Sequence, residues 1–570
     1  MLTPIAFCKL SCRFALIAVV CSLLVSARPR EKEKESNSEV KFTSHTELVL
    51  IPTLVTDKSG NHIKGLKQEE FTVLENGAEQ KIATFEEITS DAQRASRPRN
   101  PGEFSNTVTG GTPNRRLTII VLDLLNTRFT DQAYARKDLL KYLSESVNQR
   151  EPTALYTLTR TGIHVVHDYA TDPRVLVAAL HKVRGDASEM VDSPETVEGI
   201  TGTAGPDGSA GIDAESVRSE ASEIQSMMED SELNFQSFMQ RLAITYTLEG
   251  MQQVAQAVSG FPGRKSLIWA SGGFPFSVSD NSMSLAPAGR DSLSDVMPLY
   301  ERTWQLLNNA QISLYPVDVK GLQSFDAPSS VGNPGENYGR NMRWRNLDTL
   351  SSFQTFAAMT GGRAYYNSND LAKGFREAVS DSSEYYMLGY YLDRTRTKAG
   401  WRKLAVKVKR DHIEVRARSG FFVTNVTVDP GNSRNNDISS ALQSPLNYTS
   451  LSMVVRWDKI DPAQATGKKH VNFVVHLAPD TTFIDAADNN HLALDVVVLA
   501  RTPEGKSADP PVTTKIDTHL PADKASAMSR DGIGYQSAID LAPGEYTVRF
   551  VVRNALSGRT GSVAAPLKVE

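Results

Sequence analysis

The chain has 570 residues, with 62 Lys and Arg against 66 Asp and Glu, and a formal net charge of -4 at pH 7. Its hydrophobic content of 40% and charged content of 22% are ordinary for globular proteins, so they exclude a wholly disordered chain, and the length suggests three or four domains. The balanced charge excludes nucleic acid as the main partner, because phosphate binding needs a basic face.

Residues 1–27 have the pattern of a secretory signal peptide. Lys9 and Arg13 supply positive charge, residues 14–25 are apolar, and Ala27 completes a small-residue cleavage site. About a dozen apolar residues are too few to span a bilayer comfortably. We therefore predict cleavage after Ala27, with an uncleaved membrane anchor as the alternative interpretation.

All three cysteines lie inside this segment, so cleavage would leave a chain without disulfides, thiolate metal sites or cysteine nucleophiles. Residues 28–43 then form a charged linker. No later run of about 18 apolar residues follows, so we predict no further membrane span. The expected location is the periplasm, the cell surface or the medium.

Residues 44–89 have the composition of a short β segment. Residues 71–75 and 80–85 flank Asn76-Gly77. This predicts a hairpin, because Asn-Gly favours the positive φ angles of a tight type I′ turn. Residues 90–114 are rich in Pro, Asn, Gly and Arg, which indicates a linker.

Strands and helices alternate between residues 116 and 380. Residues 117–122 form a continuous apolar run, typical of a strand buried on both faces of a sheet. We expect further strands at 154–158, 163–167, 265–269 and 312–317, and helices at 172–183, 241–258 and 350–359. The alternation predicts an α/β, doubly wound (Rossmann-like) parallel sheet. Residues 184–234, rich in Gly, Ser and acidic residues, are expected to form a mobile surface insertion.

The pattern becomes antiparallel after residue 385. Residues 385–424 contain strands in which apolar and basic side chains alternate. We expect them to pair with the segment 44–89 in one small sandwich, because neither piece alone has enough strands for a stable core. Residues 441–570 carry strands at regular spacing, which predicts an immunoglobulin-like β-sandwich.

The buried strand leads into Asp123-Leu-Leu-Asn-Thr127. A carboxylate at the C-terminal end of a parallel strand lies where open α/β sheets bind ligands. With this strand, residues 263–272, Tyr315-Pro-Val-Asp318 and Thr360-Gly-Gly362, the chain resembles a von Willebrand factor A-type domain. More narrowly, residues 45–424 resemble the bacterial VWFA-related family described from Acidobacteria, in which β segments precede and follow the A domain.

The resemblance implies a divalent cation held by Asp-x-Ser-x-Ser, a distant Thr and a later Asp. Asp123 and Thr127 fit this pattern and are the candidate metal ligands, with Mg²⁺ as the ion because all ligands are oxygens. Leu125 stands at the first Ser position and cannot ligate. Either Thr245 or Thr247 could be the distant Thr.

Ser271 stands where the resemblance expects the second Asp, so the predicted metal-ion-dependent site is degenerate. Asp123, Asn126, Thr127 and Ser271 are the candidate binding residues. The alternative is that Asp123 caps a helix or pairs with a loop donor, and that Leu125 simply packs.

From these features we predict an exported, non-enzymatic binding or adhesion-type protein that uses the A-type domain for protein–protein interaction. The partner is an unknown protein or surface ligand, and the oligomeric state stays open. One alternative is a structural envelope or scaffold protein with a metal-free A-type domain. A hydrolase is the other alternative, but Trp269 breaks the G-x-S-x-G pattern around Ser271, and we predict no catalytic residues.

Overall fold

The computed structural model describes a set of ranges that begins at residue 46. These ranges are 46–89, 102–107, 117–145, 152–185, 214–278, 285–286, 295–321, 350–381, 384–393, 397–423, 430–463, 467–480, 483–486 and 488–570. The predicted signal peptide (1–27) and charged linker (28–43) lie outside them. Within the described ranges, no helix combines the length and the apolar character needed to cross a bilayer.

Two four-stranded antiparallel sheets are built jointly from residues 46–88 and 385–423. Their orders are β15-β1-β13-β4 and β16-β14-β2-β3. The strands are β1 (Thr46–Asp57), β2 (Phe71–Glu75), β3 (Ala78–Gln80), β4 (Thr84–Ile88), β13 (Tyr385–Asp393), β14 (Gly400–Val408), β15 (Ile413–Arg416) and β16 (Gly420–Val423), with a 3-10 turn at Gln68–Glu70. Both sheets contribute side chains to one apolar core, so the two distant segments share it.

The predicted Asn76-Gly77 hairpin is confirmed. It joins β2 to β3, with Val73 opposite Gln80. Asn76 has φ 47° and Gly77 has φ 86°, so both central residues are left-handed, as a type I′ turn requires.

A five-stranded sheet in the order β12-β9-β6-β7-β8 occupies the middle of the chain. Its strands are β6 (Leu117–Asp123), β7 (Thr153–Thr159), β8 (Gly162–Ala170), β9 (Lys265–Ser271) and β12 (Ile312–Asp318). The first four strands in this order pair in parallel, whereas β7 and β8 are antiparallel because only two residues join them. The sheet is therefore mixed and not purely parallel.

Helices cover both faces of this sheet. They are α1 (Phe129–Glu145), α2 (Pro173–Leu180), α4 (Ala214–Val258), α5 (Met297–Asn309), α7 (Leu371–Ser380) and a helix at 350–360, with a short β10–β11 hairpin (Ser277–Val278 and Leu285–Ala286). Ile119 and Val121 of β6 pack in the core with α4 and α5, and Ile120 and Leu122 pack with α1 and α7. This alternation is what a strand buried on both faces requires.

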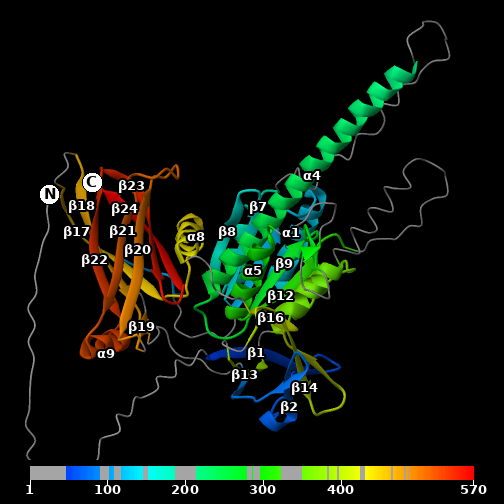
Figure 1. The fold of residues 1–570 in the computed structure, drawn as a ribbon, viewed down its shortest axis with the longest axis horizontal. Helices are drawn as coiled ribbons and strands as arrows, with labels where there is room; N and C mark the ends of the chain where they lie inside the picture. Colours follow the sequence, from blue (N-terminus) through cyan, green and yellow to red (C-terminus); the bar gives the residue numbers. More distant parts are fainter. Residues whose placement is uncertain are drawn as a thin grey trace, which may run out of the picture. The chain divides into compact units, whose positions relative to one another are not determined.

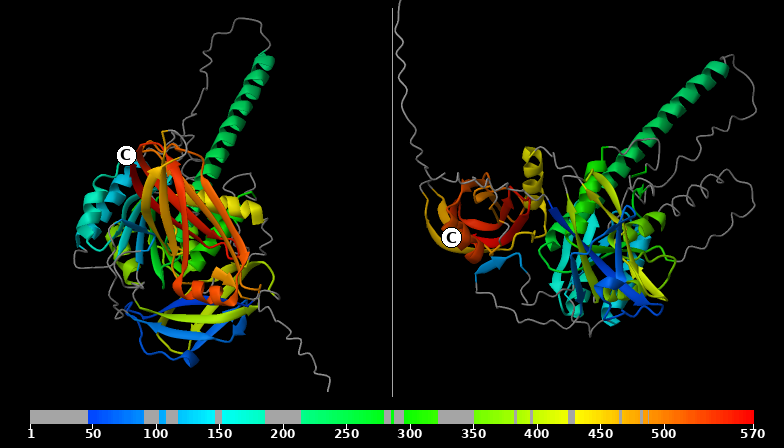
Figure 2. Two further views of the ribbon diagram at one scale, coloured as in Figure 1. Left: turned by 90° about the vertical axis from the view of Figure 1, so that its left-hand side faces the viewer. Right: turned by 60° about the horizontal axis from the view of Figure 1, so that its bottom comes forward.

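Helix α4 is longer than the sequence predicts. It has 45 residues, and its N-terminal half extends away from the sheet in each view (Figures 1 and 2). Residues 214–234, expected within a mobile insertion, are helical, and residues 186–213 lie outside the described part. The reason is that 214–234 contain five Glu, two Ala and two Met residues, which favour helix even without tertiary packing.

The C-terminal residues form two antiparallel sheets around one apolar core. One has the order β22-β18-β17-β5 and the other β19-β20-β23-β24, with β21 also on β20. The elements are β5 (Glu103–Ser105), α8 (Pro430–Gln443), β17 (Met453–Pro462), β18 (Lys469–Leu477), β19 (Ile484–Asp485), β20 (His491–Arg501), β21 (Val512–His519), α9 (Ala522–Asp531), β22 (Ile533–Leu541), β23 (Gly544–Asn554) and β24 (Thr560–Val569). Strand β5 comes from the predicted linker 90–114, so part of that segment is structured.

The predicted fold class, an α/β doubly wound (Rossmann-like) fold, is wrong for this chain. The described strands contain more residues than the described helices, and five of the six sheets in the described ranges have only antiparallel pairs. Even the central sheet carries an antiparallel edge strand. For β8 the reason is that only residues 160–161 separate it from β7, and a connection that short can join only antiparallel strands.

Candidate functional site

Three parallel strands end at one edge of the central sheet, each with a polar residue. Asp123 ends β6, Ser271 ends β9 and Asp318 ends β12. Asp318 is opposite Ser271 in the register. Parallel strands place their carboxyl ends at the same edge, so the sequence-predicted residues Asp123 and Ser271 come together there.

The Asp123 carboxylate is the centre of a buried hydrogen-bond network. The residue is 1% exposed. Its oxygens accept hydrogen bonds from the Asn126 backbone N–H (3.0 Å) and side-chain amide (2.9 and 3.1 Å), from Trp269 Nε1 (3.0 Å) and from Ser271 Oγ (2.8 Å). An ionised carboxylate has about four lone-pair sites, so these donors fill its capacity to accept hydrogen bonds.

Asn126 connects this carboxylate to helix α4. Its amide nitrogen also donates to Thr247 Oγ1 at 2.9 Å, and the Thr247 hydroxyl donates onward to the Ala243 carbonyl at 2.7 Å. Thr245 instead donates to the Arg241 carbonyl. Of the two threonines left open by the sequence, the structure therefore brings Thr247 to the site.

Thr127 lies beside this network and is also buried. Its hydroxyl accepts the Gly272 backbone N–H at 2.8 Å, which ties the loop after β6 to the loop after β9. Leu125 is fully buried in the apolar core with α4, as expected for a residue that packs. Among the four predicted binding residues, only Asn126 has partial solvent access.

Burial dominates the electrostatics of this edge. Desolvation raises the pKa of Asp123 above its usual value, and the hydrogen bonds from Asn126, Trp269 and Ser271 oppose that shift. Burial also raises the pKa of Asp318, and nearby Lys320 opposes this shift.

Trp269 belongs to the network, although the sequence analysis gives it no such role. The signal in the sequence is its position two residues before Ser271, which places both side chains on the same face of β9.

The residues of this network do not fit a divalent cation. The amide nitrogen of Asn126, not an oxygen, lies between Asp123 and Thr247, because an amide oxygen there would oppose the carboxylate. The N–H and O–H hydrogens that point at Asp123 would repel a cation, and they already occupy the lone pairs that ligation needs.

One large apolar side chain is exposed beside this edge. Phe129, the first residue of α1, is 52% exposed. Beside it is a cavity of about 50 Å³ whose walls include Asp123, Thr127 and Arg136. Gln240 of α4 donates to the Pro275 carbonyl (2.8 Å), which holds α4 against the loop after β9.

A larger cavity of about 340 Å³ lies between the helix at 350–360 and residues 415–417. Its cationic wall residues are Arg363 and Arg416. Arg363 pairs with Glu414 at 2.8 Å, and Arg416 pairs with Asp381. Both guanidinium groups thus have carboxylate partners within the chain.

The comparisons give no close relative. No family model matches the chain, and no curated protein matches it. Among solved structures, an aerotolerance-related membrane protein from Bacteroides fragilis is 9% identical, with a TM-score of 0.23, covering 46% of this chain and 98% of its own. The pilus adhesin SpaC from Lactobacillus rhamnosus is 8% identical with a TM-score of 0.25, covering 90% and 74%.

A third solved structure, the N-terminal domains of the type V pili tip protein Mfa5 from Porphyromonas gingivalis, is 9% identical. Its TM-score is 0.24, and the match covers 85% of this chain and 95% of the other. Pilus proteins are thus among the structures that resemble this chain, but similarities at this level carry no argument about its function.

Proposed function

We propose that this chain is an exported, non-enzymatic binding protein of the adhesion type, and that it binds a protein partner through helix α4 and the adjoining edge of the central sheet. The predicted membership of the von Willebrand factor A-type family stays a prediction that accords with this role. The observation that carries the proposal is a group of exposed apolar side chains on α4.

Three apolar residues of α4 are largely exposed: Met227 (63%), Phe235 (53%) and Phe238 (56%). With 3.6 residues per turn they fall within an arc of about 80° on one face of the helix. Phe238 lies about 14 Å along the helix from Thr247, toward the N-terminal end of α4. Exposed aromatic side chains gathered on one face mark an interaction surface.

The chemistry of the edge favours binding over catalysis. The Ser271 hydroxyl is fully buried and lies 2.8 Å from Asp123 and 2.7 Å from the Gly273 carbonyl, so a substrate cannot reach it as a nucleophile. The Asp123 carboxylate is saturated by donors. We infer that the network holds the loops after β6 and β9 in place and that binding there needs no metal ion.

A site-specific cross-linking experiment tests the proposed surface. A photoreactive phenylalanine analogue at position 238 should capture a protein partner from the source cells. The same analogue at position 460 is the matched control, because Ile460 is 45% exposed on β17, in a different sheet. Equal capture at both positions would contradict the proposal, and capture at 460 alone would favour the scaffold alternative, in which the β modules make the contacts.

The role of the network has its own prediction. Asp123→Ala leaves the buried Trp269 Nε1–H without its acceptor and removes one acceptor each from Asn126 and Ser271, so we expect the free energy of unfolding to fall by about 3 kcal/mol. Urea unfolding of both proteins, with and without Mg²⁺, measures this. Mg²⁺ should shift neither midpoint, and a Mg²⁺-dependent gain in the wild type that Asp123→Ala abolishes would show that the site is a metal site after all.

A further inference from the structure

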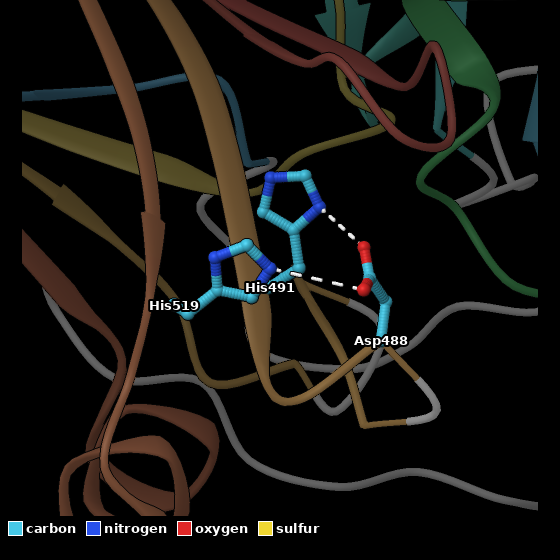
Figure 3. A group of neighbouring side chains, drawn as sticks. All are labelled: Asp488, His491 and His519. Atoms are coloured by element: carbon cyan, nitrogen blue, oxygen red, sulfur yellow. Dashed lines mark hydrogen bonds and ion pairs between the residues drawn. The ribbon is translucent and has the colours of Figure 1, made fainter. Parts of the chain in front are cut away.

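Two histidines and an aspartate meet at one end of the sheet that contains β20 and β21 (Figure 3). His491 begins β20, His519 ends β21, and the register places them directly opposite each other. Directly opposed residues of antiparallel strands point to the same face. The two imidazole rings accordingly lie nearly parallel, with centroids 4.7 Å apart and planes at 16°.

Asp488 reaches the same place from the turn between β19 and β20. This turn is held in a defined shape, because Asn489 and Asn490 adopt left-handed φ angles of 47° and 56°. The His491 N–H donates to the Asp488 carbonyl at 3.0 Å, and Leu520 exchanges hydrogen bonds with Asn490 at 3.1 and 3.3 Å. The backbone that carries the three side chains is therefore fixed by two strands and a tied turn.

The potential ligand atoms converge. Asp488 Oδ2 lies 3.0 Å from His491 Nδ1, and Asp488 Oδ1 lies 3.7 Å from His519 Nε2. All three ligand atoms lie within 4.8 Å of one another. Tetrahedral Zn²⁺ with bonds of about 2.0–2.2 Å sets its ligands about 3.3–3.6 Å apart. Small rotations of the side chains would therefore complete that geometry.

A second carboxylate contacts the other ring nitrogen of His491. Asp517 Oδ1 lies 2.8 Å from His491 Nε2, on the opposite side of the ring from Asp488, and Lys515 Nζ holds the other Asp517 oxygen at 2.9 Å. When neutral His491 carries its proton on Nε2 and donates that hydrogen bond to Asp517, its Nδ1 lone pair faces the Asp488 carboxylate. Two acceptors at that separation need a proton or a metal ion between them. The carboxylate–histidine–metal arrangement supplies that ion.

We propose that Asp488, His491 and His519 form a binding site for a divalent transition-metal ion of the Zn²⁺ class, with Asp517 as the residue that orients His491. Two imidazole nitrogens and one carboxylate oxygen suit this class, whereas Mg²⁺ and Ca²⁺ prefer ligand sets made of oxygen alone. Bound metal would join the β19–β20 turn to the end of β21. Three protein ligands leave one position for water or for a partner's side chain.

This site is separate from the Asp123 edge. It shares no residue with the surface proposed for binding, so each proposal can fail without the other. Asp488 is 60% exposed and His519 is 51% exposed as side chains, so both can be substituted with little effect on packing.

The test is a calorimetric titration of ZnCl₂ into the full chain and into His519→Ala. We expect the wild type to show a binding event that is at least tenfold weaker in the variant. Cys8, Cys12 and Cys21 are present in both proteins, so the difference isolates this site. The matched control is His470→Ala, because His470 Nδ1 lies 2.6 Å from an Asp540 oxygen in an exposed pair that belongs to no such cluster in the described residues.

Asp517→Asn separates orientation from ligation. It keeps all three ligands but weakens the hold on the His491 ring, so Zn²⁺ affinity should fall by about 10- to 100-fold. Thermal unfolding in EDTA should be alike for all these proteins, and added Zn²⁺ should raise the midpoint of the wild type and His470→Ala more than that of His519→Ala and Asp517→Asn. The same Zn²⁺ affinity and stoichiometry in the wild type and His519→Ala, or a wild type without Zn²⁺ binding, would overturn the proposal.

Discussion

Lys265 shows how a single buried residue sets a pH dependence. It is the first residue of β9 and is 2% exposed, and its side-chain nitrogen donates to the Ala310 carbonyl at 2.7 Å. Burial lowers the pKa of Lys265 from 10.5 to about 7, because the charged form loses its contact with water. The folded protein therefore prefers the neutral amine, whereas the unfolded chain holds the proton up to about pH 10.5.

Between pH 7 and 10.5 the unfolded state binds more protons, so the free energy of unfolding should rise with pH in this window. Urea unfolding at several pH values from 7 to 9.5 measures the slope, and Lys265→Met should flatten it. Lys373→Met is the control, because that side chain is 65% exposed. Equal slopes in the wild type and Lys265→Met would refute the assignment.

At the scale of elements, the helix at 350–360 packs very closely on β12. It ends just before Gly361, which has φ 75°, and the Gly362 N–H donates to the Ala357 carbonyl at 2.8 Å. A Cβ at position 362 would lie 1.9 Å from the Leu314 carbonyl oxygen of β12. Glycine at this position is thus what lets the chain leave the helix against the strand.

Replacing this glycine should push the two elements apart. We expect Gly362→Ala to lower the free energy of unfolding by about 2–3 kcal/mol, because the atom it would strike belongs to backbone and cannot rotate away. Gly534→Ala serves as the comparison, since a Cβ there meets nothing within 4 Å, and its effect should stay within about 0.5 kcal/mol. Chemical denaturation ranks the two variants, and similar costs would count against this packing.

At the scale of the whole molecule, residues distant in sequence are locked together by a buried carboxylate. Glu75 on β2 is 4% exposed. It accepts hydrogen bonds from Tyr390 Oη on β13 at 2.8 Å and from Arg402 Nε on β14 at 2.6 Å. These partners lie more than 300 residues away in the sequence, so the contact joins the two halves of the small β unit.

Breaking this contact should destabilise the unit as a whole. Glu75→Ala leaves the Arg402 charge half-buried and the Tyr390 hydroxyl without its acceptor, so we expect a loss of about 3 kcal/mol. Glu79→Ala, on the exposed neighbouring strand β3, should change little. Thermal unfolding of both variants checks this. The unfolding midpoint should fall for Glu75→Ala and should stay at the wild-type value for Glu79→Ala.

Several local features could be predicted from the sequence. The buried strand before Asp123 followed from its unbroken apolar run, and the Asn76-Gly77 turn followed from residues that tolerate positive φ. The meeting of Asp123 and Ser271 could be inferred too, because parallel strands end at one edge. These features depend on backbone geometry within a few residues, which composition and spacing record.

Tertiary structure alone decided the rest. Three features depend on side-chain orientation or strand register. Donors from Asn126 and Trp269 saturate the Asp123 carboxylate, and β5 joins a sheet whose other strands lie some 350 residues later in the chain. His491 also faces His519 across two paired strands. Register and orientation are fixed by packing between segments that are far apart in sequence, and no local pattern encodes them. The sequence by itself thus determined where polar residues leave the buried strands, and the packed molecule determined which atoms they meet.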